Sequence, residues 1–173
     1  TVIDWAALPG RVGAVAAELR RLGVGAGDGV VAYLPDIAEA VVAFLAAAAV
    51  GAVWSSCGQD YAPEGAAARL GQLAPKVLFS CDGYRFNGRW IDKRADTAQL
   101  LELLPGTGLI LLDGAAYQEM VANPVAPETT PVPFDHPLWV LFTSGTTGRP
   151  KGIAHGHGGV LLEHLKSIVL HGD

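Results

Sequence analysis

Cysteine is scarce: Cys57 and Cys81 are the only two in 173 residues, and their spacing forms no C-x-x-C motif. A disulfide framework is therefore not expected, and a reducing compartment, the cytoplasm, fits this cysteine usage. Both cysteines stand in apolar stretches, where a buried and inert thiol is the default. We expect neither to have a chemical role.

Positive charge is also in short supply. The chain carries 12 lysines and arginines against 17 aspartates and glutamates, which gives a net charge of −5 at pH 7. Domains that bind nucleic acids usually present clustered lysine and arginine side chains. The sequence shows no such basic footprint, so we expect no nucleic-acid partner.

A hydrophobic run long enough to span a membrane is missing too. Residues 40–54 are apolar throughout, but a spanning helix needs ~20 such residues. A buried helix that leads into a buried strand explains this run better. Asp4 and Glu18 interrupt the apolar residues near the start, so we expect neither a signal peptide nor a membrane partner.

Half of the residues are hydrophobic, enough for one domain with a sizeable core, and apolar strands alternate with helical segments. The expected strands are 30–34, 52–56, 77–80, 109–112, 138–142 and 151–155. The expected helices are a first one after Asp4, loosened by Pro9 and Gly10, then 36–50, 63–73, 92–104, 117–121 and one from 158 or 159 to about 170. This alternation predicts an α/β fold with a mainly parallel sheet, flanking helices and right-handed crossovers.

Two connections carry signals of their own. Residues 84–90 enclose Asn87-Gly88, a dipeptide typical of the tight turn of a β-hairpin. Five prolines between residues 123 and 137 predict a loop that crosses the surface. Trp5, Trp54, Trp90 and Trp139 lie in apolar patterns, so we expect all four to pack in the core.

The most informative stretch follows the strand expected at 138–142. It reads Thr143-Ser144-Gly145-Thr146-Thr147-Gly148-Arg149-Pro150-Lys151-Gly152. Hydroxyls and main-chain N–H groups donate hydrogen bonds, glycines allow close approach of a ligand, and the two bases add positive charge. We interpret the stretch as a cradle for a phosphate chain; a flexible turn between two strands is the alternative. It matches neither the Walker A spacing nor the G-x-G-x-x-G fingerprint of dinucleotide sites.

This stretch resembles the phosphate loop of the adenylate-forming enzymes: acyl-CoA synthetases, luciferases and the adenylation domains of peptide synthetases. The resemblance implies that Thr143, Ser144, Gly145, Thr146, Thr147, Gly148 and Lys151 hold the β- and γ-phosphates of ATP. It also implies that Lys151 is catalytic, because it would neutralise charge growing on pyrophosphate, and that Mg²⁺ arrives with ATP.

The resemblance covers essentially the whole chain, but only the first part of the family's length. The sequence has no aromatic-Gly-x-Thr-Glu segment, no Thr-Gly-Asp segment and no lid domain with a catalytic lysine. We therefore expect residues 1–173 to be a single partial AMP-binding N-terminal domain, with the phosphate loop at 143–152. Residues 1–173 alone are not expected to form acyl-CoA.

Within the family, residues 75–88, 132–141 and 151–166 are most similar to acetoacetyl-CoA synthetases. The implied reaction is that of an acid–CoA ligase: acetoacetate, ATP and CoA give acetoacetyl-CoA, AMP and pyrophosphate through an acyl-adenylate. Residues 57–61 read Cys-Gly-Gln-Asp-Tyr where that group tends to have Cys-Ser-Pro-Asp-Phe, and Gly152 replaces a common alanine. Acetate, propionate or another short acid therefore stays open, as does a nucleotide-binding module without catalysis.

Two further sets of residues have side chains that could form a binding site. Arg85 and Arg89 flank the expected turn, where the related acetyl-CoA synthetases contact the 3′-phosphate of CoA with arginine. We expect a CoA contact there, with solvated surface charge as the alternative. His155 and His157 alternate on a segment expected to be extended, so they would point to opposite faces, and no ligand-spaced carboxylate or cysteine accompanies them. We expect no metal site.

Overall fold

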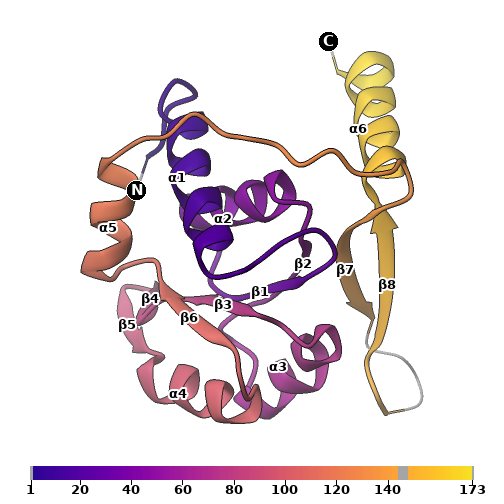
Figure 1. The fold of residues 1–173 in the computed structure, drawn as a ribbon. Helices are drawn as coiled ribbons and strands as arrows, with labels where there is room; N and C mark the ends of the chain where they lie inside the picture. Colours follow the sequence, from indigo (N-terminus) through magenta and orange to yellow (C-terminus); the bar gives the residue numbers. More distant parts are fainter. Residues whose placement is uncertain (1, 144–147, 173) are drawn as a thin grey trace.

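A six-stranded sheet in the order β6-β3-β1-β2-β7-β8 lies at the centre of the computed structural model, which describes residues 2–143 and 148–172 (Figure 1). Its strands are β1 (Gly29–Tyr33), β2 (Val53–Cys57), β3 (Val77–Ser80), β6 (Gly108–Leu111), β7 (Pro137–Thr143) and β8 (Lys151–Gly156). All neighbours are parallel except β7 and β8, which form an antiparallel pair. The predicted α/β fold with a mainly parallel sheet is confirmed.

Helices cover both faces of the sheet (Figure 1). They are α1 (Leu8–Arg21), α2 (Ala38–Ala49), α3 (Pro63–Leu70), the short 3₁₀ helix η1 (Gly71–Leu73), α4 (Arg94–Leu103), α5 (Ala115–Ala122) and α6 (His157–His171). One buried cluster joins α1, α2 and α5 to the sheet, and a second joins α3 and α4 to its other face. The central strands β1 and β3 are thus buried on both sides, as is typical of parallel sheets.

The residues of β1 explain the two clusters. Successive side chains of a strand point to opposite faces of the sheet. Val30 and Ala32 belong to the cluster under α1 and α2, whereas Val31 and Tyr33 belong to the cluster under α3 and α4. All four side chains have no solvent exposure, so the continuous apolar run of β1 marks the centre of the molecule.

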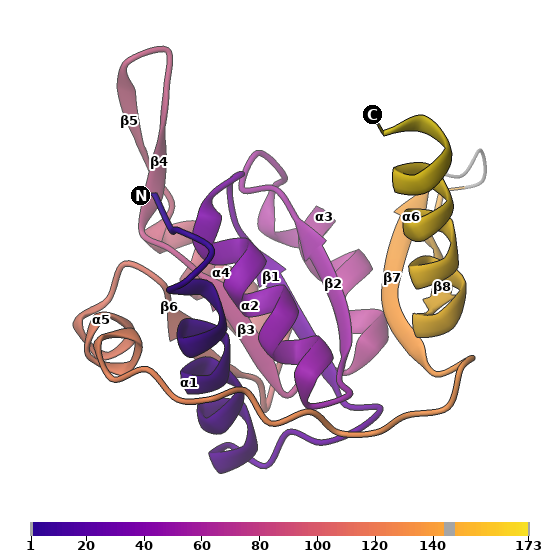
Figure 2. The ribbon, with the colours of Figure 1, turned by 90° about the horizontal axis from the view of Figure 1, so that it is seen from above.

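A strap of residues 123–136 without regular structure connects α5 to β7 and passes over the α1 side of the sheet (Figures 1 and 2). The Val125 N–H donates to the carbonyl of Gly10 at 3.1 Å, and the Thr130 N–H donates to that of Ala49 at 2.8 Å. The strap approaches α1 so closely that a Cβ at Gly13 would lie 1.9 Å from the Val125 oxygen. The predicted surface loop is therefore tied to the two helices it crosses.

The hairpin of β4 (Gly83–Phe86) and β5 (Arg89–Asp92) projects from the body beyond the end of β3 (Figure 2). Asn87 and Gly88 form its turn with φ of 48° and 77°. Positive φ at both central positions is the geometry that favours Asn-Gly in two-residue hairpins. The hairpin expected from the dipeptide is confirmed.

Helix α6 lies beside the β7–β8 pair, apart from the other helices (Figure 2), and none of its residues is buried. Its exposed apolar side chains are Leu161, Leu162, Leu165, Ile168, Val169 and Leu170. No helix within residues 2–143 and 148–172 combines the length and apolar character needed to cross a membrane.

Three local expectations were wrong. Trp5 is 87% exposed and Trp90 is 53% exposed, because one precedes α1 and the other lies on the projecting hairpin. Pro9 does not loosen the first helix: α1 begins at Leu8, and Pro9 occupies its first turn, where no N–H partner is required. Trp54 is buried and Trp139 packs against the core, as expected.

Candidate functional site

The two ends of the phosphate loop are fixed by the β7–β8 pair. Thr143, the last residue of β7, pairs with Lys151, the first residue of β8. Side chains at paired positions lie on the same face, so the hydroxyl and the ammonium group can serve one ligand. The expected phosphate contacts of Ser144, Gly145, Thr146 and Thr147 lie outside the described residues.

The second half of the loop borders an open hollow of about 650 Å³. Its lining residues are Gln72, Arg149, Pro150, Lys151 and Gly152. The Gln72 side-chain amide donates to the Pro150 carbonyl at 3.1 Å, which ties the loop to η1, the short helix that follows α3. Gly148 has φ of +93°, a conformation that glycine adopts at little cost, and so permits the loop to turn toward this hollow.

The strand that carries the loop is anchored by packing and by one side-chain hydrogen bond. The Ser55 hydroxyl of β2 donates to the Val140 carbonyl of β7 at 2.8 Å. The Phe44 ring lies 5.6 Å from the Trp139 ring and 6.0 Å from the Trp54 ring, distances typical of aromatic pairs. The phosphate loop therefore extends from a strand held on both β2 and α2.

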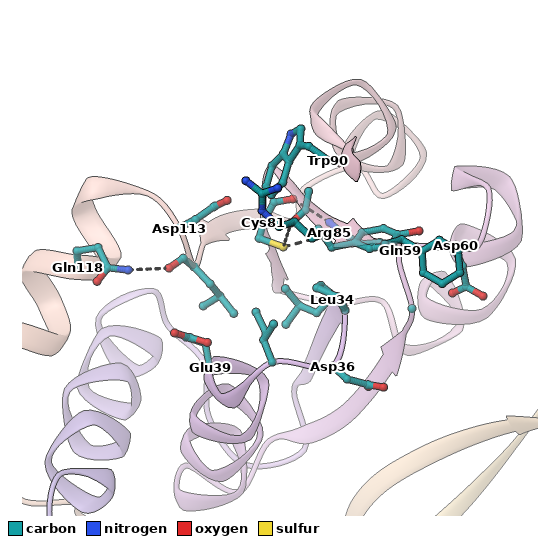
Figure 3. Close-up of a pocket in the computed structure, with 17 residues that line it drawn as sticks. Leu34, Asp36, Glu39, Gln59, Asp60, Cys81, Arg85, Trp90, Asp113 and Gln118 are labelled. Carbon is teal, nitrogen blue, oxygen red and sulfur yellow. Dashed lines mark hydrogen bonds between the residues drawn. The ribbon is translucent and has the colours of Figure 1, made fainter. Parts of the chain in front are cut away.

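A second and larger pocket, of about 970 Å³, lies on the other side of the molecule beside the hairpin (Figure 3). It opens at the carboxyl ends of β1, β2, β3 and β6, through residues such as Leu34, Gly58, Cys81 and Leu112. Pockets of open α/β sheets form at this edge. This pocket and the hollow beside Lys151 share no lining residue.

The charges of the large pocket are unevenly arranged. Arg85 is the one basic residue among the described residues that line it, and it stands on the hairpin. The acidic lining residues come from the edge of the sheet and the helices (Figure 3): Asp36, Glu39, Asp60 and Asp113. Positive charge is therefore confined to the rim that the hairpin forms.

The hairpin separates the two arginines singled out from the sequence. Arg85 pairs with Trp90, and Arg89 pairs with Phe86. Because adjacent positions of a strand face opposite ways, Arg85 and Arg89 lie on opposite faces of the hairpin. Arg85 and Trp90 line the pocket, as does Phe86 from the other face, but Arg89 does not.

A buried polar network under the pocket escaped the sequence analysis. Gln59 is 1% exposed, and its amide donates to the Cys81 carbonyl at 2.8 Å. The Ser80 hydroxyl lies 2.8 Å from that of Thr97 and donates to the Tyr33 carbonyl at 3.2 Å. The only sequence signal was the departure at residues 57–61, which gave no hint of burial.

Burial also shifts the acidities of three groups near the pocket. It raises the pKa of Cys57 and that of Cys81 to about 11. It raises the pKa of Tyr33 as well, and the Tyr33 hydroxyl donates to the Tyr61 carbonyl at 2.6 Å. All three groups are thus held in their neutral forms, and the expected burial of both thiols is confirmed.

The two histidines near the loop belong to different elements. His155 lies in β8 with its ring 6.3 Å from that of Trp139, and His157 begins α6 with its ring 5.8 Å from that of His136. The pKa of His157 is lowered, mainly by burial and to a smaller extent by the charge of the nearby His136. Within residues 2–143 and 148–172, no three His, Cys, Asp or Glu side chains come together in a way that could hold a metal ion.

A model of the AMP-binding enzyme family matches residues 2–171. The acetoacetyl-coenzyme A synthetase of Rhizobium meliloti (strain 1021) is 39% identical in an alignment 186 positions long, gaps included, that covers 98% of this chain and 28% of that protein. The acetoacetyl-CoA synthetase of Rattus norvegicus is 36% identical in an alignment of 184 positions that covers 94% of this chain and 27% of that protein. The chain thus spans less than a third of the length of these curated relatives.

Solved structures show the same relationship. The acetoacetyl-CoA synthetase from Streptomyces lividans superposes with a TM-score of 0.91 at 46% identity, over 97% of this chain and 28% of that one. VinN, in its complex with 3-methylaspartate, superposes with a TM-score of 0.79 at 20% identity, over 96% and 44% of the two chains. At that identity the second likeness concerns the fold alone.

Proposed function

The chain belongs to the family of AMP-binding enzymes, and from that premise we propose that it forms the triphosphate-binding part of an acid–CoA ligase acting on acetoacetate. The observation that carries the proposal is the phosphate-loop sequence at 143–152, placed directly after β7. The similarity to acetoacetyl-CoA synthetases over nearly the whole chain supports the choice of acid.

The proposed reaction has two steps. In the first, a carboxylate oxygen of acetoacetate bonds to the α-phosphorus of ATP, and the bond from that phosphorus to pyrophosphate breaks. In the second, the CoA thiolate bonds to the acyl carbon, and the bond from that carbon to AMP breaks. Mg²⁺ would enter with ATP and offset part of the charge on its phosphates.

The loop residues act on the leaving pyrophosphate in the first step. Negative charge grows on this group as the bond breaks, so preorganised donors stabilise the transition state more than the ground state. Lys151 supplies the positive charge, and Thr143 shares its face of the β7–β8 pair. The other donors in the proposal are the hydroxyls and N–H groups of Ser144, Gly145, Thr146, Thr147 and Gly148.

The large pocket suits the nucleotide end of CoA in the second step. Guanidinium groups bind phosphate well because their N–H donors form a planar fork. Arg85 offers this fork at the hairpin rim, while the four carboxylates that line the rest of the pocket disfavour an anion beside them. We therefore assign the phosphate to the rim beside Arg85. Arg89 does not line the pocket, and it contributes only if CoA extends beyond the pocket along the hairpin.

The proposal is tested by supplying the protein that contains these residues with ATP, Mg²⁺, CoA and one acid at a time. Acetoacetate, acetate and propionate form the panel, and mass spectrometry follows acyl-CoA and AMP. Acetoacetate is expected to give the fastest turnover. If another acid turns over faster, that acid replaces acetoacetate as the proposed substrate. If ATP binds but no adenylate forms, a nucleotide-binding module without catalysis is favoured.

Arg85→Ala is expected to raise KM for CoA about tenfold or more, the loss that accompanies one charge-assisted hydrogen bond, and to spare the adenylate half-reaction. Pyrophosphate exchange measures the first step, and thioester formation measures the second. Arg21→Ala is the matched control, because Arg21 is exposed on α1 and pairs only with Glu18. Equal losses in both steps would remove Arg85 from the CoA site.

A further inference from the structure

The hairpin β4–β5 is held mainly at its base. It projects from the body (Figure 2), so its direction depends on residues 81–83, which lead into it, and on residue 93, which follows it. The Lys93 N–H donates to the Asp82 carbonyl at 2.7 Å and closes the base. Side chains of the body bind this base from both ends: Asp96 of α4 pairs with the Lys93 ammonium at 2.7 Å, and Asp113 and Gln59 bind residues 82 and 81.

The bond from Asp113 comes from the β6 side. Its carboxylate accepts the Asp82 N–H at 2.8 Å. Asp113 follows β6, and Asp82 is exposed enough that water can compete for the same N–H. This contact therefore constrains the base less firmly than a buried one would.

The bond from Gln59 is buried and comes from the β2 side (Figure 3). Its Nε2 donates to the Cys81 carbonyl at 2.8 Å and lies 3.4 Å from the Ser80 hydroxyl. Its Oε1 lies 3.5 Å from the Cys81 sulfur, whose one S–H can donate to it or to the Gly83 carbonyl, also at 3.5 Å. Both ends of one side-chain amide therefore contact Cys81, the first residue of the hairpin base.

Gln59 is itself held in place. Its main-chain carbonyl lies 3.2 Å from the hydroxyl of the fully buried Tyr33, which makes a shorter bond of 2.6 Å to the Tyr61 carbonyl. The main chain and the side chain of Gln59 thus connect the ends of β1, β2 and β3 beside the pocket that Arg85 and Trp90 line. A buried amide is costly unless each polar end has a partner, so this geometry is strongly preferred over alternatives.

We propose that Gln59 is a positioning residue for CoA use: it fixes the base of the β4–β5 hairpin and thereby holds Arg85 over the large pocket. The inference rests on the proposed function in that it takes the pocket as the CoA site. Gln59 also lines this pocket, but the residue is only 1% exposed, so it acts through Arg85 and not by binding CoA.

The first test measures the hairpin itself and is independent of CoA. In the protein that contains these residues, Gln59→Met keeps the length of the side chain and removes both polar ends. Hydrogen exchange of the amides of residues 84–91 is expected to become about two- to tenfold faster, the worth of one hydrogen bond. Gln99→Met is the matched control, because Gln99 is exposed and donates only to Glu64.

The second test separates the two half-reactions. Gln59→Met is expected to raise KM for CoA about three- to tenfold, on the same hydrogen-bond scale, while pyrophosphate exchange with acetoacetate stays at the wild-type rate. A residue needed only for folding would slow both half-reactions together. Gln59→Asn keeps the amide but shortens its reach, so its values should fall between those of wild type and Gln59→Met in both tests. It replaces Gln59→Met as the test variant if Gln59→Met does not fold.

The outcomes distinguish this inference from the proposed function. Unchanged hairpin exchange in both Gln59 variants would overturn the positioning role, whatever CoA does. Faster exchange with unchanged KM for CoA would also overturn it, provided Arg85→Ala raises that KM. If neither Arg85→Ala nor Gln59→Met affects CoA use, the CoA site is wrong, and the role of Gln59 in CoA use is withdrawn with it.

Discussion

Lys151 owes its position to one pair in the antiparallel ladder. It stands opposite Thr143, and both are exposed at the end of the β7–β8 pair. Because the strands on either side of the loop are paired, the loop cannot spread without breaking the ladder. The main chain that carries the ammonium group is therefore in place before a phosphate arrives, which favours electrostatic stabilisation of a transition state.

Lys151→Ala is therefore expected to slow adenylate formation about 10²-fold or more, the scale of losing one preorganised donor. Pyrophosphate exchange in the protein that contains these residues is the measurement. Lys166→Ala is the control, because Lys166 pairs only with Glu163 on the exposed face of α6. An exchange rate unchanged by Lys151→Ala would end the catalytic role assigned to this residue.

The buried thiols give a prediction with a definite pH dependence. Burial raises the pKa of Cys57 and that of Cys81 to about 11. At pH 8 about one such thiol in a thousand is ionised, against about one in four at the ordinary pKa near 8.5. Since the thiolate is the reactive form, alkylation of the folded protein should be slow at pH 8 and still rising about tenfold per pH unit at pH 10.

The measurement is the rate of reaction with iodoacetamide between pH 7 and 10, with the protein in denaturant as the reference. Denaturation should make both cysteines react at ordinary rates. A folded-state profile that levels off near pH 8.5 would show that burial does not control these thiols.

At the scale of elements, the contact between α1 and the strap of residues 123–136 depends on a missing side chain. Glycine inside a helix costs about 1 kcal/mol relative to alanine. Gly13 nevertheless occurs in the middle of α1, and a Cβ there would overlap the Val125 oxygen. The close approach of the strap explains why glycine is kept at this position.

Two glycine-to-alanine substitutions should therefore have opposite signs. Gly13→Ala is expected to lower the free energy of unfolding by about 1–3 kcal/mol, because the strap must move away. Gly159→Ala in α6 is expected to raise it by up to about 1 kcal/mol, because nothing lies within 4 Å of the added methyl group. Urea denaturation of both variants is the measurement, and stabilisation by Gly13→Ala would contradict the account of the strap.

The elements themselves were largely predictable, for a physical reason. The apolar runs 30–34 and 77–80 are buried on both faces of the sheet, so their composition alone marks them as strands. Asn87-Gly88 fixed the hairpin because few other residues accept its two positive φ values. The exposure of Trp5 and Trp90 was not predictable, because local apolar pattern does not reveal which segments project from the body.

The candidate site was likewise predictable from the sequence in one part and not in another. The phosphate loop could be recognised because its chemistry is contiguous in the sequence, from Thr143 to Lys151. The large pocket could not, because its walls come from the ends of four strands that only the sheet order brings together. Gln59 and Cys81 are 22 positions apart, and nothing in either segment indicates that they share a hydrogen bond.

At the scale of the whole molecule, chain order and sheet order disagree at two places. Strand β3 passes over to the far side of β1 from β2, with β6 following it at the edge. Strand β7 returns across the molecule to pair with β2, so that Ser55 and Val140, which share a hydrogen bond, lie 85 positions apart. The strap of residues 123–136 makes this return.

The position of β7 in the chain sets an order of assembly. Strands that are close in sequence pair at a small cost in loop-closure entropy. The long connection that leads back to β2 costs more, and this cost must be met before β7 gains any contact. Strands β1, β2, β3 and β6 should therefore acquire exchange-protected amides before β7 and β8 during refolding, as pulsed hydrogen exchange can measure; simultaneous protection would contradict this. Until β7 arrives, the free side of β2 is an unpaired strand edge, the kind of surface through which chains aggregate. The phosphate loop, carried by β7, would then be among the last parts of the molecule to be built.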